Sequence, residues 1–384
     1  MLLHFSPAKL AKATLGTLLL SSLVSAAPRK MATPPVSMNV PSWGLGPFVK
    51  ADAANPVLKP NKESTFADPI RGAAVHWEAD HTFNPAAVVR DGKVMVIYRA
   101  EDDSGAGIGQ HTSRLGLAES ADGLHFTRRA TPVFYPGPDE QKGNEWPGGC
   151  EDPRIEETED GGYALTYTQW NRDKARLAVA TSRDLLTWQK HGPVFAKAYE
   201  GRFVNEWSKS GSIVTKRQGD HLIATKINGK YWMYWGEGTI HIATSTNLTD
   251  WEPVLDANNN LATAFGTVPG SFDSSLAEPG PPAVLTDAGI VFLFNGRNAE
   301  NAARDPQVKG GAYSGGQVLL DSQNPARLIA RTSHPFIMPE RPYEVTGQYA
   351  AGTVFIEGLV HFKGQWMLYY GTADSFVAVA VAKG

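Results

Sequence analysis

A repeated turn constrains the fold of this chain more than any other feature. Residues 120–126, 182–188 and 245–251 each begin with serine, carry Asp or Asn two positions later and end on an aromatic side chain. These aromatic residues, Phe126, Trp188 and Trp251, are 62 and 63 positions apart (188 − 126 and 251 − 188). A fixed period of this length, with several strands in each unit, is typical of a β-propeller. We expect the three aromatic side chains to pack between strands.

Short apolar runs separated by Gly- or Asp-centred turns accompany the repeat. They pair as hairpins over residues 86–89 with 94–99, 155–157 with 163–168, 212–215 with 221–227, 283–285 with 290–295, and 354–361 with 365–370. Helical periodicity is almost absent. From His76 to Gly384 the chain has room for about five units of this period. The sequence therefore predicts an all-β fold, a five-bladed β-propeller over residues 71–384 with an extended N-terminal arm over residues 27–70.

The N-terminus and the overall charge indicate where the protein works and what it binds. Lys9 and Lys12 precede an apolar stretch over residues 13–24, and a run of small residues ends at Ala26. This is the layout of a secretory signal peptide over residues 1–26, so we expect an exported protein, periplasmic or secreted. The net charge of −3 offers no basic excess for nucleic acid, and no later segment is apolar enough to span a membrane.

Carboxylates recur where the predicted hairpins end, in all five units. They are Glu101, Asp102, Asp103, Glu151, Asp152, Glu237, Glu278 and Asp374. Because propeller loops meet around a central axis, we expect several of these acids to share one pocket. Such a pocket suits either a hard cation or acid–base chemistry on a sugar. The chain has no Asp-x-Asp-x-Asp-Gly loop, so we predict sugar chemistry without a metal or other cofactor.

Two further residue types lie near these acids. Aromatic side chains offer flat faces for sugar rings, although each could equally pack within a sheet, and they are Trp170, Trp207, Trp232, Trp235, Tyr369 and Tyr370. The single cysteine, Cys150, permits no intrachain disulfide. Nothing in the spacing of the histidines marks a Cys/His pair, so we expect a buried, inert thiol.

Six short motifs follow one another in order along the chain. They read Asn-Pro-Ala at 84–86, Tyr-Arg-Ala-Glu-Asp at 98–102, Arg-Leu-Gly-Leu-Ala at 114–118, Glu-Asp-Pro-Arg-Ile at 151–155, Gly-Pro-Pro at 280–282 and Tyr-Tyr-Gly-Thr-Ala-Asp at 369–374. Together they resemble glycoside hydrolase family 130, the β-mannoside phosphorylases and β-mannosidases. The resemblance implies a five-bladed propeller and an inverting reaction on a β-mannoside oligosaccharide substrate.

The same resemblance implies roles for individual residues. Asp152, within Glu-Asp-Pro-Arg, corresponds to the general acid, whose proton reaches the leaving oxygen through a mannose hydroxyl. The residues at motif positions that line the mannose subsite are Asn84, Arg99, Asp102, Arg154 and Asp374.

The attacking group is the remaining choice, because the family contains both phosphorylases and hydrolases. A phosphorylase must hold a phosphate dianion with basic donors, whereas an inverting hydrolase needs a carboxylate base to activate water. Glu237 and Glu278 would repel phosphate in a pocket of low dielectric, and they resemble the paired glutamates of the hydrolytic members. Lys209 and His241 keep phosphate binding open.

The sequence therefore favours an exo-acting, inverting β-mannosidase, expected to act on β-1,2 linkages, with Glu237 and Glu278 as the candidate base residues. Three alternatives stand beside it. The first is a phosphorylase that releases mannose 1-phosphate, and the second is a non-catalytic propeller that binds mannosides. The third, a five-bladed arabinosidase or fructosidase, would lack the ordered motifs.

Overall fold

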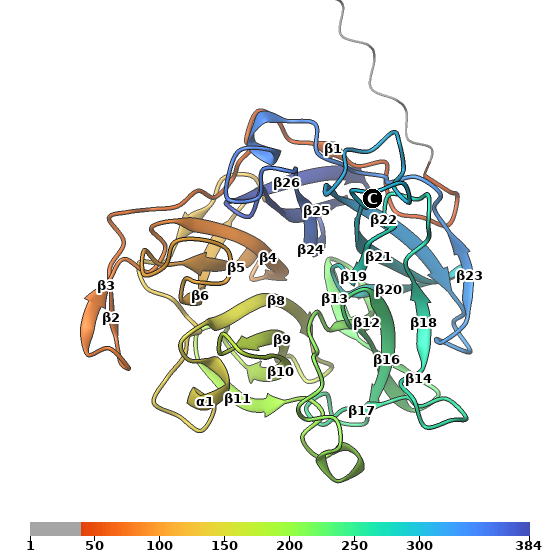
Figure 1. Cartoon of the computed structure of the whole chain (residues 1–384), viewed down its shortest axis with the longest axis horizontal. Coiled ribbons are helices and arrows are strands. Elements are labelled where there is room, and N and C mark those ends of the chain that lie inside the picture. Colours follow the sequence, from red (N-terminus) through yellow and green to blue (C-terminus); the bar gives the residue numbers. More distant parts are fainter. Residues whose placement is uncertain (1–39) are drawn as a thin grey trace, which may run out of the picture. The chain divides into compact units, whose positions relative to one another are not determined.

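The structure is a computed structural model that describes residues 40–384 (Figure 1). The predicted signal peptide and residues 27–39 of the predicted arm lie outside the described residues. The prediction of an all-β protein is confirmed for the part that the structure describes, because its helices are only short turns. They are α1 (Lys142–Glu145), η1 (Ala198–Gly201) and η2 (Pro342–Glu344).

Antiparallel strands follow one another in groups along the chain. The first group contains β4 (His81–Arg90), β5 (Lys93–Glu101), β6 (Ser113–Ser120) and β7 (Thr127–Arg128). The second contains β8 (Gly149–Glu157), β9 (Tyr163–Trp170), β10 (Ala175–Ser182) and β11 (Trp188–Pro193). Each group begins with a long, almost fully buried strand, which explains why these strands read as continuous apolar runs.

The third and fourth groups are more interrupted. The third contains β12 (Ser212–Gln218), β13 (His221–Ala224), β14 (Lys226–Ile227), β15 (Lys230–Trp235), β16 (Thr239–Ser245), β17 (Glu252–Pro253) and β18 (Thr263–Gly266). The fourth contains β19 (Leu276–Pro279), β20 (Ala283–Thr286), β21 (Gly289–Arg297), β22 (Tyr313–Leu320) and β23 (Leu328–Arg331). Both β19 and β20 pair with β21.

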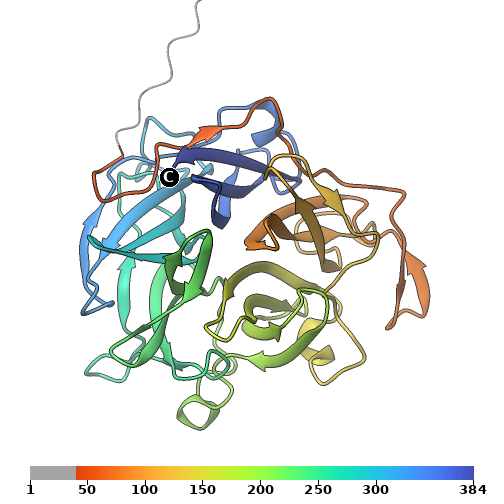
Figure 2. The ribbon, with the colours of Figure 1, turned by 180° about the vertical axis from the view of Figure 1, so that it is seen from behind.

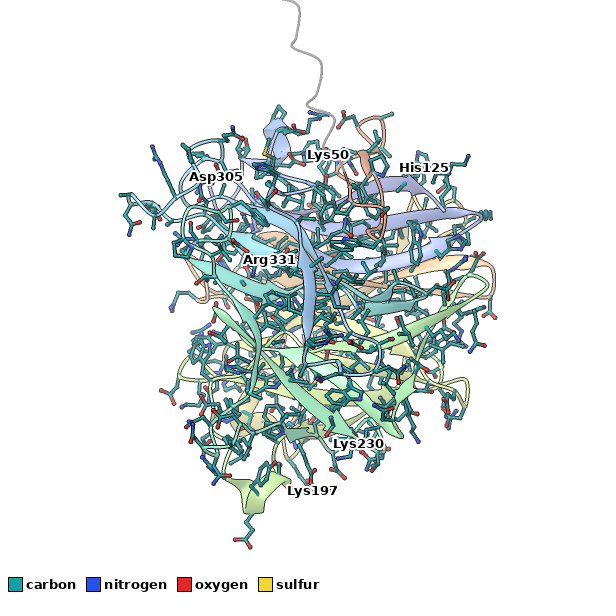
Figure 3. All side chains as sticks on the ribbon, turned by 90° about the vertical axis from the view of Figure 1, so that its right-hand side faces the viewer. Lys50, His125, Lys197, Lys230, Asp305 and Arg331 are labelled. Carbon is teal, nitrogen blue, oxygen red and sulfur yellow. The ribbon has the colours of Figure 1, made fainter. Side chains whose placement is uncertain are left out.

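The last group combines the two ends of the described chain. It contains β24 (Val354–Phe362), β25 (Gln365–Thr372) and β26 (Phe376–Lys383), and β1 (Val49–Lys50) adds to it by pairing Val49 with Val381. Lys50, labelled in Figure 3, is buried and binds the Glu344 carboxylate at 2.8 Å and the Met338 carbonyl at 2.7 Å. The N-terminal segment is thus fastened to the C-terminal strands. A separate hairpin is formed by β2 (Phe66–Asp68) and β3 (Ala73–Val75).

All five predicted hairpins are present as antiparallel pairs. Successive groups contact one another, because β4 contacts both β24 and β8, and β12 pairs in parallel with β20. Figures 1 and 2 show this succession from opposite sides, with the colours running in order through the groups. Strands that are far apart in sequence therefore lie side by side.

The repeated turn has one hydrogen-bond pattern at all three positions. The hydroxyls of Ser120, Ser182 and Ser245 each accept the backbone N–H three residues on, at 2.8–2.9 Å. The Asp or Asn two positions after each serine accepts the next two available backbone N–H groups. These are side-chain-stabilised turns of the Asx type, which explains the spacing in the sequence. The closing aromatic residues pack as predicted, with Trp251 buried and Phe126 and Trp188 half-buried against the core.

Four of the aromatic side chains that the sequence offered for sugar binding pack within the sheets. Trp235, Tyr369 and Tyr370 are buried, and Trp232 packs against the core, so these four belong to the sheets. Arg331, labelled in Figure 3, also packs in this way, with its guanidinium 4.9 Å from the centre of the Phe294 ring. No helix among residues 40–384 is long and apolar enough to cross a membrane.

Candidate active site

A cavity of about 290 Å³ collects most of the residues that the sequence singled out. Of the predicted site residues, those that line it are Asn84, Arg99, Asp152, Glu237, Glu278 and Asp374. They come from β4, β5, β8, the turn after β15, β19 and the turn after β25. A larger hollow of about 680 Å³, lined by Tyr163, Trp188 and Tyr231 among others, contains none of them.

Asp152 is placed by an irregularity in β8. The pairing of β8 with β9 shifts register between Glu151 and Arg154, and Asp152 takes the left-handed conformation with φ of 47°. A bulge of this kind redirects a side chain out of the sheet. Asn84 has φ of 45° at a similar register shift in β4, between Phe83 and Pro85. The two irregularities bring the Asn84 amide to 2.8 Å from the Asp152 carboxylate, to which it donates a hydrogen bond.

Arg99 connects the acids on this side of the cavity. Its guanidinium lies 3.0 Å from Asp152, 2.8 Å from Glu151 and 2.5 Å from Glu101. Burial opposes ionisation of Asp152, but Arg99, Lys209 and the Asn84 amide together hold the pKa of that carboxyl well below its usual range. Asp152 is therefore an anion in the site without substrate.

Two neighbouring acids have raised pKa values, in contrast to Asp152. Burial raises the pKa of Glu151 to about 7, with Arg99 opposing the shift and the charge of Asp152 adding to it. Burial likewise raises the pKa of Asp374 to about 7, and the charges of Glu101 and Asp152 add to the effect. Several carboxylates around one guanidinium cannot all ionise easily, so protons are held on the less well paired ones.

A second set of acids lies around Lys209. Its ammonium is 3.2 Å from Glu278 and 3.5 Å from Asp152. Burial opposes this charge, but Glu278, Glu237 and Asp152 hold the pKa of Lys209 well above its ordinary value. Glu278 is buried, which raises its pKa, and it accepts a hydrogen bond from the Ser210 hydroxyl. Glu237 is exposed and accepts a hydrogen bond from the indole N–H of Trp207 at 3.0 Å.

Comparison with known proteins identifies the family. The family model described as β-1,4-mannooligosaccharide phosphorylase, that of glycoside hydrolase family 130, matches residues 52–383. A 1,2-β-oligomannan phosphorylase from Thermoanaerobacter sp. (strain X514) is 32% identical over 334 residues, covering 85% of this chain and 94% of the relative. The chain belongs to glycoside hydrolase family 130.

Solved structures of family 130 and related proteins are also similar. A glycosyl hydrolase from Bacteroides ovatus is 50% identical with a TM-score of 0.87, covering 89% of this chain and 95% of that one. A structure reported for family 130 hydrolases that target β-1,2-mannosidic linkages in Candida mannan is 50% identical with a TM-score of 0.88, covering 90% and 98%. The resemblance to the family seen in the sequence is thereby confirmed.

Two residues expected in the family 130 mannose subsite do not line the cavity. Asp102 is fully buried, accepts the Thr112 N–H and lies 2.9 Å from the Arg114 guanidinium. Arg154 is also fully buried, where it lies 3.0 Å from Glu357 and donates to the carbonyls of Asp152, Pro279 and Gly280. The assignment of Asp102 and Arg154 to the mannose subsite stays a prediction.

One cluster near the family 130 cavity has the composition of a metal site. Ligand atoms of His81, Glu101 and His111 all lie within 4.8 Å of one another. The Glu101 carboxylate, however, already accepts hydrogen bonds from Arg99 at 2.5 Å and from the Gln348 amide at 2.9 Å. A cation there would share its carboxylate with a guanidinium, so we assign Glu101 to holding Arg99.

Several cavity residues were not predicted as members of the site. Glu101 and Glu151 were noticed only as acids at hairpin ends, and Lys209 only as a possible phosphate ligand. Gln348 and Tyr349 line the cavity from the segment before β24 and belong to no motif. Cys150 is fully buried, and burial raises the pKa of its thiol well above the usual value, as expected of an inert cysteine.

Proposed function

We propose that this protein is an exo-acting, inverting β-mannosidase that hydrolyses β-1,2-linked manno-oligosaccharides. The observation that carries the proposal is the placement of Glu237 and Glu278 in the same cavity as Asp152. The named hydrolases at 50% identity support the hydrolytic reading, and one of them is described as acting on β-1,2 linkages.

The charge of the cavity supports hydrolysis over phosphorolysis. Six carboxylates line it, namely Glu101, Glu151, Asp152, Glu237, Glu278 and Asp374, against the two cations of Arg99 and Lys209. Even with Glu151 and Asp374 protonated, the carboxylates outnumber the cations, and both cations are already paired with acids. A phosphate dianion would enter a site with excess negative charge, whereas water would meet carboxylates able to accept its proton.

Lys209 holds two of these acids close together. The Asp152 and Glu278 oxygens both contact its ammonium, at 3.5 and 3.2 Å, so they are less than about 7 Å apart. Because this limit covers the separations of both retaining and inverting glycosidases, the assignment of inversion rests on the family resemblance. Glu237, which is exposed, has access to water and is the second candidate base. In the empty site the pKa of Asp152 is lowered, whereas that of Glu151, on the same guanidinium, is raised to about 7, so Glu151 is a neighbouring acid that can supply the proton.

Incubation with β-1,2-mannobiose, with and without phosphate, tests the proposal. Hydrolysis yields mannose at the same rate in both. The alternative, phosphorolysis, is favoured by the names of the relatives at 23–32% identity, which include β-1,2-mannobiose phosphorylases. Mannose 1-phosphate that forms only when phosphate is present would establish that alternative. Binding of mannobiose without release of any sugar would indicate a non-catalytic mannoside-binding protein.

Two further predictions belong to this proposal. We propose that the five strand groups are the blades of a five-bladed propeller, which the repeated turn and the contacts between successive groups support. A crystal structure with a different number of radial sheets would refute it. Export after cleavage near Ala26 also remains a proposal, and N-terminal sequencing of the mature protein tests it.

A further inference from the structure

One short segment touches every acid that we assign to the chemistry. Between η1 and β12, Trp207 donates to Glu237 at 3.0 Å, and Lys209 lies 3.5 Å from Asp152 and 3.2 Å from Glu278. Ser210 donates to Glu278 as well. Three of the four residues over 207–210 therefore each contact at least one of these carboxylates.

The segment is held firmly, with one part left open. Ser208 is buried, its backbone N–H donates to the Ala175 carbonyl at 3.3 Å, and its hydroxyl accepts the Leu177 N–H at 3.0 Å. Both contacts tie it to β10. Trp207, in contrast, is 47% exposed although its indole lines the cavity. An exposed apolar side chain is informative where it belongs to a contiguous patch, because such patches mark binding surfaces.

Trp207 lies in an apolar rim at the mouth of the cavity. Its ring lies edge-on to that of Trp170, with centres 6.0 Å apart, and Ile108, which is 57% exposed, also lines the cavity. The polar residues that suit a terminal mannose, Asn84 and Arg99, are buried. In an exo-acting enzyme the terminal sugar occupies the buried end, so the rest of the oligosaccharide leaves through the mouth.

The turn that carries Glu237 leaves its side chain dependent on this indole. The backbone is fixed on both sides, because the Gly236 N–H donates to the Lys209 carbonyl at 3.0 Å and the Gly238 N–H donates to the Ala277 carbonyl at 2.9 Å. Both glycines have positive φ, 118° and 87°, which fits the tight turn. Within the described residues, Trp207 supplies the one side-chain hydrogen bond to the Glu237 carboxylate.

We infer that Trp207 is a specificity-determining and positioning residue, whose exposed ring binds the leaving-group sugar while its N–H orients Glu237. The inference rests on the proposed function, since it assigns Glu237 to the hydrolytic step. An aromatic face suits the apolar face of a sugar ring, and a hydrogen bond to a carboxylate fixes the direction in which that carboxylate accepts a proton. Substrate recognition and water activation would thus meet in one side chain.

Two substitutions separate the two roles. Trp207→Leu removes the ring, and Trp207→Phe keeps a ring but removes the N–H donor. The substrates are β-1,2-mannobiose and methyl β-mannoside, which lacks a leaving-group sugar. Trp207→Leu should lower the ratio of kcat/KM for β-1,2-mannobiose to kcat/KM for methyl β-mannoside about tenfold. Trp207→Phe should keep that ratio and lower kcat about tenfold for both substrates, with KM little changed.

Tyr199→Leu is the matched control, because Tyr199 lies in η1, just before this segment, and is also 47% exposed but does not line the cavity. Tyr199→Leu should change neither the ratio of the two kcat/KM values nor kcat. An unchanged ratio in Trp207→Leu would overturn the recognition role, and a wild-type kcat in Trp207→Phe would overturn the positioning role. Release of mannose 1-phosphate by the unmodified protein would instead overturn the hydrolytic proposal, and the substrate ratio, measured in phosphate, would still test recognition.

Discussion

The two sides of the cavity use the same residue types in different ways. On one side Arg99 holds Asp152, Glu151 and Glu101 in buried ion pairs, and Asn84 adds a hydrogen bond. On the other side Glu237 is exposed and depends on the Trp207 indole. The first side is preorganised before any sugar arrives. The second is anchored through its backbone but leaves its carboxylate open to solvent. Lys209 connects the two sides, because its ammonium contacts both Asp152 and Glu278.

The strongest test of the preorganised side is Asp152→Asn. Removal of the acid that we assign to proton donation should lower mannose release about 10³-fold, within the range for an acid–base group. Asp103→Asn is the control, because Asp103 is a nearby exposed acid that does not line the cavity. Rates of mannose release from β-1,2-mannobiose decide the matter, and a rate within threefold of the unmodified protein would remove Asp152 from the mechanism.

The two candidate bases are tested by Glu237→Gln and Glu278→Gln, each expected to lower kcat about 10²-fold. The corresponding alanine variants then identify the base, because azide attacks the anomeric carbon in place of the activated water and needs no general base. The alanine variant that forms mannosyl azide with inverted configuration marks the replaced glutamate as the base. Near-normal turnover in both glutamine variants would show that neither glutamate activates water.

Arg154 distinguishes residues that line the cavity from those that support it. Arg154→Met leaves the Glu357 carboxyl and three backbone carbonyls buried without their donor, so the free energy of unfolding should fall by about 3–5 kcal/mol. The double variant Arg154→Met, Glu357→Met should recover only part of the loss, because the three carbonyls still lack a donor. Urea denaturation measures both. A large loss of mannose affinity with unchanged stability would return Arg154 to the sugar subsite.

The smallest expected effect concerns pH. The pKa of Asp374 is raised to about 7, so between about pH 4 and 7 the folded state binds more protons than the unfolded state, and stability falls as pH rises through this range. Asp374→Asn should therefore reduce the drop in Tm between pH 5 and pH 8, by about 2–4 °C. Asp122→Asn is a suitable control, because the pKa of that exposed carboxyl is lowered and does not titrate in this window. An identical drop in Asp374→Asn would show that Asp374 is ionised throughout.

The features of the fold that could be predicted from the sequence are those formed by residues close together in the chain. The serine-initiated turns are formed by hydrogen bonds within a few residues, so their spacing exposed the repeat and the all-β fold. Hairpins were found for the same reason. The acids at hairpin ends were recognised as a group, and Asp152, Glu237, Glu278 and Asp374 do meet.

Asp102 and Arg154 do not line the cavity, and the sequence could not show this, because a motif does not say which way a side chain points. Asp102 follows Glu101 directly, and strand residues alternate between faces, so only one of the pair reaches the cavity. At Asp152 a register shift and a positive φ decide the direction, and neither is visible in the letters Glu-Asp-Pro-Arg. Lys209 gained its place only through contacts with acids 57 and 69 positions away (209 − 152 and 278 − 209).

The sequence by itself determined the strand-rich repeat, the family and the set of acids from which the site is built. The tertiary structure alone decided which acids share Arg99 and which share Lys209, and hence which carry a proton. The physical reason is that a pKa depends on burial and on charges within a few ångströms, and these neighbours come from different strand groups. The repeat could predict that the strand groups contact one another. Only their packing determines which side-chain atoms come into contact.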